Sequence, residues 1–310
     1  MSENKVSIIL GAGALGMSVM EALVSQNRPV KMVSSTGSAK VRKGVEITSA
    51  NALDFSSLSK AVKGADKIYN CAAPHYTEWD TKFIPMMENI IKVAENTQAT
   101  LIHGDNLYMY GLVDKAISED LPHKAAGKKG IIRANIQKMI IDAHKTNKIK
   151  SVVGSSSSFY GPYVNQAVAG KDVFFAAIYG KSAPVLGNID MPHTFTYVKD
   201  FAKALIMLSD SEKALGGVWH VPAAPAVSTR EFISMIYKKA GNEPKFRIAT
   251  RQMVSIFGIF SKNMRELKET MYMYENPVIV SSEKFSREFG DISTSHLDGI
   301  GNTLEWYRSN

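Results

Sequence analysis

Residues 6–16 read VSIILGAGALG. The run from 6 to 10 is short and nearly all apolar, which predicts a strand buried on both faces of a parallel sheet. After the glycines, residues 15–26 place apolar side chains at the spacing of an amphipathic helix. A Gly-x-Gly-x-x-Gly pattern that joins a strand to a helix predicts a turn that binds the pyrophosphate of a dinucleotide.

The three glycines of this turn have separate physical tasks. Gly11 permits the tight turn, Gly13 lets backbone N–H groups approach the pyrophosphate, and Gly16 lets the helix pack closely on the strand. The N-terminus of the helix adds a partial positive charge. A glycine turn that merely packs is the alternative, but the strand and the helix on either side favour cofactor binding. The residues predicted to bind the cofactor here are Gly11, Gly13, Ala14, Leu15 and Gly16.

The end of the second predicted strand, 30–33, indicates which dinucleotide binds. Sites that prefer NAD usually carry Asp or Glu there, about 20 residues beyond the glycines, to hold the ribose 2′-hydroxyl. Residues 33–37 read VSSTG and contain no acid, while three cations follow within 40–43. A missing carboxylate removes the repulsion against a 2′-phosphate, and the cations can pair with it unless they are simply solvated. We therefore expect NADP, with NAD as the alternative. The residues expected to contact it here are Ser34, Ser35 and Thr36.

Beyond the glycine turn, predicted strands and helices alternate. The strands are 30–33, 45–48, 67–73, 100–103 and 150–153, and the helices are 54–63, 81–96 and 130–146. This alternation is typical of an α/β fold with a doubly wound, mostly parallel sheet.

After residue 162 the alternation loosens. We expect 1–162 to form the dinucleotide-binding domain and 163–310 to form a smaller, mainly helical C-terminal region that binds the substrate. The stretch 196–224 is expected to rejoin the first domain through a strand at 217–221. Ser228 and Glu231 have the spacing of a capping box, which predicts a helix from there to Ala240.

The composition excludes several classes of function. The chain has 310 residues, a net charge of +8, one cysteine and seven histidines. Its cations are scattered and form no basic stripe with aromatic residues, so we expect no nucleic-acid partner. A single cysteine allows no intramolecular disulfide. The histidines show no metal-ligand spacing, so we expect no metal site.

Nothing in the sequence predicts a membrane partner. No apolar stretch approaches the roughly 18 residues needed to span a bilayer. The segment before Gly11 is too short for a signal peptide. We therefore expect a cytoplasmic protein.

From Val6 to Tyr307 the chain resembles the short-chain dehydrogenase/reductase superfamily, specifically its extended epimerase/dehydratase branch. Besides the glycine turn, the resemblance rests on DFSSL at 54–58, ADKIYNCAA at 65–73, YMYG at 108–111, FYGP at 159–162, YVKDFA at 197–202 and WYR at 306–308. It implies a Rossmann fold, a nicotinamide cofactor and an oxidoreductase or epimerase that acts on a small carbonyl or hydroxyl compound. Further expected cofactor contacts are Asn51, Ala52, Cys71, Ala72, Ala73 and Tyr160.

The active-site motif of this family is degraded in the chain. Asn106 stands at the position of the family's Ser, four residues before the Tyr of its Tyr-Gly pair. The best match to the family's Tyr-x-x-x-Lys is KGIIR at 129–133, without the phenol or the ammonium in its expected place. Arg133 can supply the positive charge but cannot titrate. Lys129 can act as an acid or base only if its pKa is depressed. The chain therefore resembles an atypical subgroup of the superfamily.

Two regions offer replacement groups. Strand alternation would put Asn106, Tyr108 and Tyr110 on one side of an extended chain. Asn106 is then a candidate oxyanion-type donor and Tyr108 a candidate acid, although both tyrosines can instead be packing residues. The second region is the loop 72–80, which looks like a pocket wall or a loop pinned by aromatic packing. The expected catalytic residues are Asn106, Tyr108, Lys129 and Arg133, and the expected substrate-pocket residues are His75, Tyr76, Trp79 and Tyr110.

Two hypotheses follow. The first is an NADP-dependent oxidoreductase or epimerase with a small-molecule substrate. The second is a non-catalytic NADP-binding sensor or regulatory protein, which the loss of the motif favours. In either form we expect a homodimer, because the apolar helices at 81–97 and 130–146 match those that pair members of the superfamily.

Overall fold

The computed structural model of the chain describes residues 6–125 and 127–310. They fall into two compact units, each built from separate stretches of chain. The first unit holds the chain up to Asp105, Ile131–Ser155 and Phe201–Trp219, and the second holds Asn106–Gly130, Ser156–Asp200 and His220–Asn310. Residues 1–5, which enter the expectation that no signal peptide is present, lie outside the described residues.

The first unit is organised around a seven-stranded sheet in the order β11-β6-β5-β4-β1-β2-β3. Its strands are β1 (Val6–Leu10), β2 (Val30–Ser34), β3 (Glu46–Ser49), β4 (Ala65–Asn70), β5 (Thr100–Asp105), β6 (Ser151–Ser155) and β11 (Val218–His220). All neighbours from β3 to β6 pair in parallel. The predicted doubly wound, mostly parallel sheet is therefore confirmed, and β11 is its edge strand next to β6. The strand order reverses beside β1, which is where sheets of this kind bind ligands.

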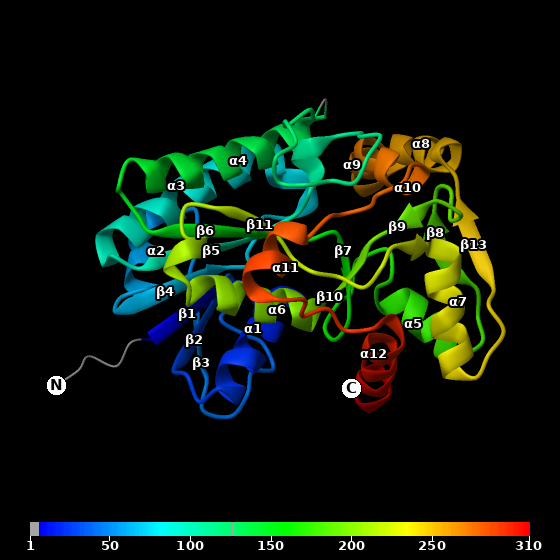
Figure 1. The fold of residues 1–310 in the computed structure, drawn as a ribbon, viewed down its shortest axis with the longest axis horizontal. Helices are drawn as coiled ribbons and strands as arrows, with labels where there is room; N and C mark the ends of the chain where they lie inside the picture. The colour runs from blue at the N-terminus through cyan, green and yellow to red at the C-terminus, as the bar shows by residue number, and fades with distance from the viewer. Residues whose placement is uncertain (1–5, 126) are drawn as a thin grey trace. The chain divides into compact units, whose positions relative to one another are not determined.

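Helices cover both faces of this sheet. They are α1 (Ala14–Ser25), α2 (Phe55–Ala61), α3 (Trp79–Thr97), α4 (Lys128–Lys145) and α6 (Val198–Ser209). In Figure 1, α3 and α4 lie on one side of the sheet, and α1 and α6 lie on the other. Close packing on the α1 and α6 side uses Gly104 of β5, where a Cβ atom would stand 2.5 Å from Leu15 Cδ2 of α1 and 3.6 Å from side-chain atoms of Leu205 and Phe201 of α6. Because the strands from β3 to β6 are parallel, their carboxyl ends lie at the same edge of the sheet.

The second unit contains short strands and many helices. Its strands form the pairs β7 (Ser158–Tyr160) with β10 (Phe195–Tyr197), β8 (Ala183–Leu186) with β13 (Phe246–Ala249), and β9 (Pro192–His193) with β12 (Val227–Ser228). Its helices are α5 (Lys171–Ile178), α7 (Thr229–Ala240), α8 (Arg251–Phe260), α9 (Lys262–Thr270), α10 (Tyr272–Glu275), α11 (Glu283–Phe289) and α12 (His296–Ser309). The helical character predicted for the C-terminal region is confirmed. That this region binds the substrate stays a prediction.

An aromatic core holds the second unit together. Phe195 and Phe232 are fully buried and their rings stack, with centroids 4.1 Å apart and planes at 12°. Tyr160 packs edge-on against Phe232, and Phe174 stacks on Tyr307. Because these side chains come from β7, β10, α5, α7 and α12, the core joins segments that are far apart in the sequence.

Two local predictions can be compared directly with the elements. The capping box is present, because the Ser228 hydroxyl accepts from Glu231 N and the Glu231 carboxylate accepts from Ser228 N at 2.8 Å. Residues 108–110, expected to be extended, form a 3-10 helix. Among the described residues, none of the helices is both long enough and apolar enough to cross a bilayer.

Candidate functional site

The glycine turn after β1 is locked on both sides. Gly11 has φ +96°, in the left-handed region that favours glycine. A Cβ atom there would lie 2.9 Å from the backbone of Ala72, and Gly11 N donates to Val33 O at 2.8 Å. At Gly16 a Cβ atom would collide with the carbonyl oxygen of Gly11. The turn therefore lies between the end of β2 and the loop after β4 and contacts both, and α1 packs closely on it.

Gly13 is different from its two neighbours. It is the N-cap of α1, with φ −77° in a region open to any residue. A Cβ atom at Gly13 would meet no other atom within 4 Å. The first turn of α1 thus presents backbone N–H groups to open space, which is the arrangement that receives a phosphate group.

This space belongs to a cavity of about 440 Å³ within the first unit. Its walls are the glycine turn, the end of β2, the loop after β3, the loop after β4 and the start of α3. The predicted cofactor residues that line it are Gly11, Gly13, Ser34, Ser35, Asn51, Ala52, Cys71, Ala72 and Ala73. His75, predicted to line the substrate pocket, lines this cavity as well. The predicted cofactor residues outside its lining are Ala14, Leu15, Gly16, Thr36 and Tyr160.

Hydroxyl groups organise the end of β2. The Ser34 hydroxyl accepts a hydrogen bond from Gly37 N at 3.0 Å, and the Ser49 hydroxyl donates to Ser35 O at 3.0 Å. Among the described residues that line the cavity, Glu78 is the one carboxylate, and its Oε1 accepts from Lys82 Nζ at 2.6 Å. No acid therefore stands at the end of β2. We expected the cations within residues 40–43 to pair with a 2′-phosphate, but they do not line the cavity.

Side-chain hydrogen bonds also fix the loop after β3. Asn51 Oδ1 accepts from Leu53 N at 3.0 Å, and Asn51 N donates to the Ser57 hydroxyl at 3.1 Å. Asn89 of α3 donates to Ala52 O at 3.0 Å. Leu53 and Leu58 add apolar surface to the cavity wall, which sequence reasoning missed. Their position around the start of α2 is the sequence signal that could have identified them as lining residues.

Hydrogen bonds between buried polar groups hold the loop after β4. Asn70 Oδ1 accepts from Ala72 N at 3.2 Å, and its amide group lies 3.0 Å from His103 Nδ1. Because the amide nitrogen can only donate, His103 Nδ1 accepts and the ring proton sits on Nε2. Burial lowers the pKa of His103 to about 4, so the ring is neutral at physiological pH. His103 and Asn70 are residues that sequence reasoning did not single out.

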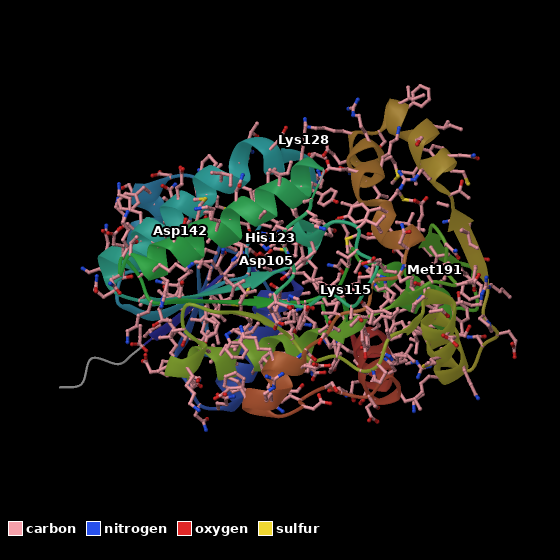
Figure 2. The ribbon with its side chains drawn as sticks, turned by 45° about the horizontal axis from the view of Figure 1, so that its top comes forward. Asp105, Lys115, His123, Lys128, Asp142 and Met191 are labelled. Atoms are coloured by element: carbon pink, nitrogen blue, oxygen red, sulfur yellow. The ribbon has the colours of Figure 1, made fainter. Side chains whose placement is uncertain are left out.

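Arg133 lies next to the hydrogen-bonded pair of Asn70 and His103. Its Nη1 donates to Asp105 Oδ1 at 2.8 Å, and both side chains are buried. The guanidinium lies over the rings of Trp79 and Phe83, 4.4 and 4.6 Å from their centroids. Asp105 is labelled in Figure 2, below α4. The structure thus brings Arg133 and Trp79 together, and the Trp79 indole donates to Pro74 O at 3.1 Å. These contacts favour packing over substrate binding for Trp79.

Burial raises the pKa of the Cys71 thiol well above its usual range. The group therefore remains a thiol at neutral pH, which makes it a poor nucleophile. This agrees with the role of a cavity-lining residue. His75, in the same loop, is exposed, and its Nδ1 lies 2.9 Å from the Thr77 hydroxyl. Tyr76 stands beside Trp79, with ring centroids 5.1 Å apart.

The remaining predicted catalytic residues lie in the second unit. Asn106 Oδ1 accepts from Tyr108 N at 3.2 Å, which starts the 3-10 helix. The expected alternation of Asn106, Tyr108 and Tyr110 along an extended chain is therefore wrong, because this side-chain hydrogen bond turns the backbone. Tyr110 is buried and its hydroxyl lies 3.0 Å from His220 Nε2. Lys129 is buried, and its ammonium forms an ion pair with Glu266.

Tyr160, expected to touch the cofactor, is a core residue of the second unit. Its side chain is 1% exposed and packs against Phe232 and Tyr197. α12 passes directly over it, since a Cβ atom at Gly299 would collide with the Tyr160 hydroxyl. Burial raises the pKa of this phenol. Any contact of Tyr160 with a cofactor stays a prediction.

Comparison with protein families gives one match that covers most of the chain. The NAD dependent epimerase/dehydratase family matches residues 7–221. Comparison with curated protein sequences gives no match.

Solved structures share the fold at low sequence identity. A UDP-glucose 4-epimerase from Thermus thermophilus in complex with NAD is 17% identical, with a TM-score of 0.79 over 98% of this chain and 99% of that chain. A dTDP-glucose 4,6-dehydratase from Bacillus anthracis str. Ames in complex with NAD is 16% identical, with a TM-score of 0.80 over 99% and 97%. A UDP-glucuronic acid 4-epimerase from Bacillus cereus, in complex with UDP-glucuronic acid and NAD, is 18% identical, with a TM-score of 0.78 over 98% and 99%.

Proposed function

The chain belongs to the NAD dependent epimerase/dehydratase family, and from this premise we propose that it is an NADP-dependent oxidoreductase or epimerase acting on a small carbonyl or hydroxyl compound. The observation that carries the proposal is the cavity of the first unit. It joins a glycine turn, a helix N-terminus and a hydroxyl-lined strand end that bears no acid. The glycine turn and the helix N-terminus suit the pyrophosphate of a dinucleotide, and the missing acid removes the repulsion against a 2′-phosphate.

Particular residues would hold the cofactor. The turn Gly11–Gly16 and the first turn of α1 would bind the pyrophosphate. Ser34, Ser35 and Thr36 would surround the adenosine ribose, and the loop at Asn51 and Ala52 would meet the adenine. The small side chains at 71–73 would let the nicotinamide half lie close to β4. When bound, this cofactor supplies a hydride acceptor or donor.

The choice of NADP can be tested at Ser34. In the wild type we expect tighter binding of NADP+ than of NAD+, measured by calorimetry. Ser34→Asp keeps an acceptor for Gly37 N but adds a charge, so it should weaken NADP+ binding by about 100-fold through like-charge repulsion. Ser34→Asn, similar in shape but neutral, is the control and should preserve the preference for NADP+. A wild type that prefers NAD+ would contradict the proposal.

For the chemical step we propose Asn106 as a hydrogen-bond donor to the substrate oxygen and Tyr108 as the proton donor. No tyrosine of the chain is followed four residues later by lysine, so the usual phenol and ammonium pair is missing. Lys129 and Arg133 occupy the matching positions, and each is ion-paired. The step therefore needs polar groups from elsewhere, and Asn106 and Tyr108 are the nearest in sequence to the family's Ser position.

Turnover of NADP(H) with a substrate panel tests this assignment. The panel should hold small carbonyl compounds together with UDP-glucose, UDP-glucuronic acid and dTDP-glucose, for which the structural neighbours are named. Asn106→Ala and Tyr108→Phe should each lower kcat by about 100-fold or more. Both variants should leave the Kd for NADP+ unchanged, because neither residue lines the cofactor cavity. Unchanged kcat in both would refute the assignment.

The second candidate is a non-catalytic sensor that binds NADP and regulates a partner protein. It is favoured by the ion pairs of Lys129 with Glu266 and of Arg133 with Asp105, which give both cations a structural role. Absence of turnover across the whole panel, together with a partner affinity that changes when NADP+ is added, would establish this candidate instead.

We further propose a cytoplasmic homodimer that pairs through α3 and α4. The outer side of α4 carries Ile131, which is 46% exposed. Light scattering after size exclusion should give twice the chain mass of 34.0 kDa. Ile131→Asp should shift the species toward the mass of one chain, and a monomeric wild type would contradict the proposal. Fractionation of cells tests the location.

A further inference from the structure

Helix α8 exposes large apolar side chains to solvent. The exposed fractions are 42% for Met253, 59% for Ile256, 56% for Phe257, 72% for Ile259 and 87% for Phe260. Isolated exposed apolar side chains are normal on a protein surface, but a cluster on one short helix marks an interaction site. Ile248, in the strand just before the helix, is 39% exposed and lies in the same segment of chain.

The opposite side of α8 is already packed. Val254 is 1% exposed, and Gly258 is buried. A Cβ atom at Gly258 would lie 3.2 Å from Arg265 Cα, so α8 and α9 form a closely packed hairpin, which Figure 1 shows side by side. A helix that is apolar on both sides is normally buried on both sides. We therefore expect another molecule or a membrane surface to cover the outer face of α8.

The exposed charged side chains of α9 are of one sign. Lys262, Arg265 and Lys268 on α9 are exposed and, among the described residues, form no ion pair. Within 246–270, all of which the structure describes, the two acids are Glu266 and Glu269, and both are half-buried and bonded to Lys129. The hairpin thus combines the exposed apolar side chains of α8 with three exposed cations on α9.

We propose that the α8–α9 hairpin docks on the surface of an anionic phospholipid membrane. The side chains of Ile256, Phe257, Ile259 and Phe260 would enter the boundary between headgroups and acyl chains. The cations of α9 would meet the lipid phosphates. Apolar and aromatic side chains next to Lys and Arg are the composition of helices that lie in this interface.

Other occupants fit the charges less well. A second copy of the chain would bring Lys262, Arg265 and Lys268 against the same three cations, and like charges repel. A neutral apolar partner would leave the cations without a role. Attachment to a membrane surface requires no spanning helix, so it is compatible with the finding that none of the described helices is both long enough and apolar enough to cross a bilayer. It does depart from our expectation of no membrane partner, which considered only spanning segments.

Vesicle sedimentation tests the proposal. The full chain should sediment with vesicles of phosphatidylcholine mixed with phosphatidylglycerol at least ~10-fold more than with phosphatidylcholine alone, and added salt should reduce this binding. The double variant Ile259→Ser/Phe260→Ser should lose at least ~10-fold of the binding. Leu297→Ser is the matched control, because Leu297 is 58% exposed on α12, and it should bind like the wild type.

A second measurement gives a positive signal and does not rely on a loss of vesicle binding. Phe260→Trp places an indole at the tip, and its fluorescence should shift to the blue with anionic vesicles only. Lys262→Glu/Arg265→Glu should abolish that shift, while circular dichroism checks that each variant is folded. If the wild type binds neither kind of vesicle, the proposal is overturned and a protein partner is indicated instead. A double variant that turns a dimer into a monomer overturns it in favour of a second copy.

Discussion

Two glycines of the same turn, three residues apart, are needed for opposite reasons. Gly16 is surrounded, since a Cβ atom there would collide with Gly11 O, whereas a Cβ atom at Gly13 would meet nothing within 4 Å. The first is required by the packing of the protein itself. The second leaves room in front of the α1 N-terminus. This difference separates a structural requirement at Gly16 from the ligand-binding requirement that we propose at Gly13.

Alanine at each position should therefore have a different effect. Gly16→Ala should lower the free energy of unfolding by about 1–3 kcal/mol, because the added methyl group is forced against backbone. Gly13→Ala should leave stability nearly unchanged, since φ −77° suits alanine, but it should weaken NADP+ binding by at least ~10-fold. Urea unfolding and calorimetric titration measure the two effects. Equal loss of stability in both variants would contradict this reading.

At this scale the sequence predicted the glycine turn and the acid-free end of β2. Those signals are local, because each depends on residues adjacent in the chain. The contact between Asn70 and His103 could not be predicted in the same way, since it exists only because β4 and β5 are neighbours in the sheet. The pairing of Arg133 with Asp105 is likewise a product of the fold.

At the scale of elements, the sequence was most informative where periodicity and capping agree. Helix α7 begins at a capping box and ends before Gly241, which adopts φ +87°. Short strands were harder: β8 and β13 have four residues each and pair in parallel across a long stretch of chain. Their hydrophobic patterns are too short to distinguish from loops.

The N-cap of α7 gives a quantitative test of this element. Ser228→Ala removes the bond from Glu231 N and should lower the free energy of unfolding by about 1 kcal/mol. Ser282 is the N-cap of α11 but makes no side-chain capping bond, so Ser282→Ala should have almost no effect. Thermal or urea unfolding distinguishes the two. A loss at Ser282 as large as that at Ser228 would argue against capping as the cause.

At the scale of the whole molecule, each compact unit contains a histidine that burial keeps neutral. His103 in the first unit and His193 in the second both have a pKa lowered to about 4. The unfolded chain binds a proton at each of these groups near pH 6.5, while the folded chain does not. Folding therefore opposes protonation, and stability is lost as the pH falls below 6.5.

We expect the free energy of unfolding to fall from pH 7 to pH 4, with up to about 3 kcal/mol from each histidine. His103→Asn cannot titrate and should have a shallower decline than the wild type, although its stability at pH 7 is lower. Urea unfolding at several pH values measures both slopes. Identical slopes would show that His103 does not contribute.

The interleaved division of the chain has a consequence for how the protein is made. The first unit is assembled from three stretches and lacks its edge strand β11 until Trp219 has been synthesised. The second unit needs α12, which ends at Ser309, to close over Tyr160. The chain must therefore be synthesised as far as Trp219 before the first unit is complete, and through α12 before the second unit is complete. The nascent polypeptide must remain soluble while its apolar strands wait for partners, so its biogenesis depends on whatever shields those strands during translation.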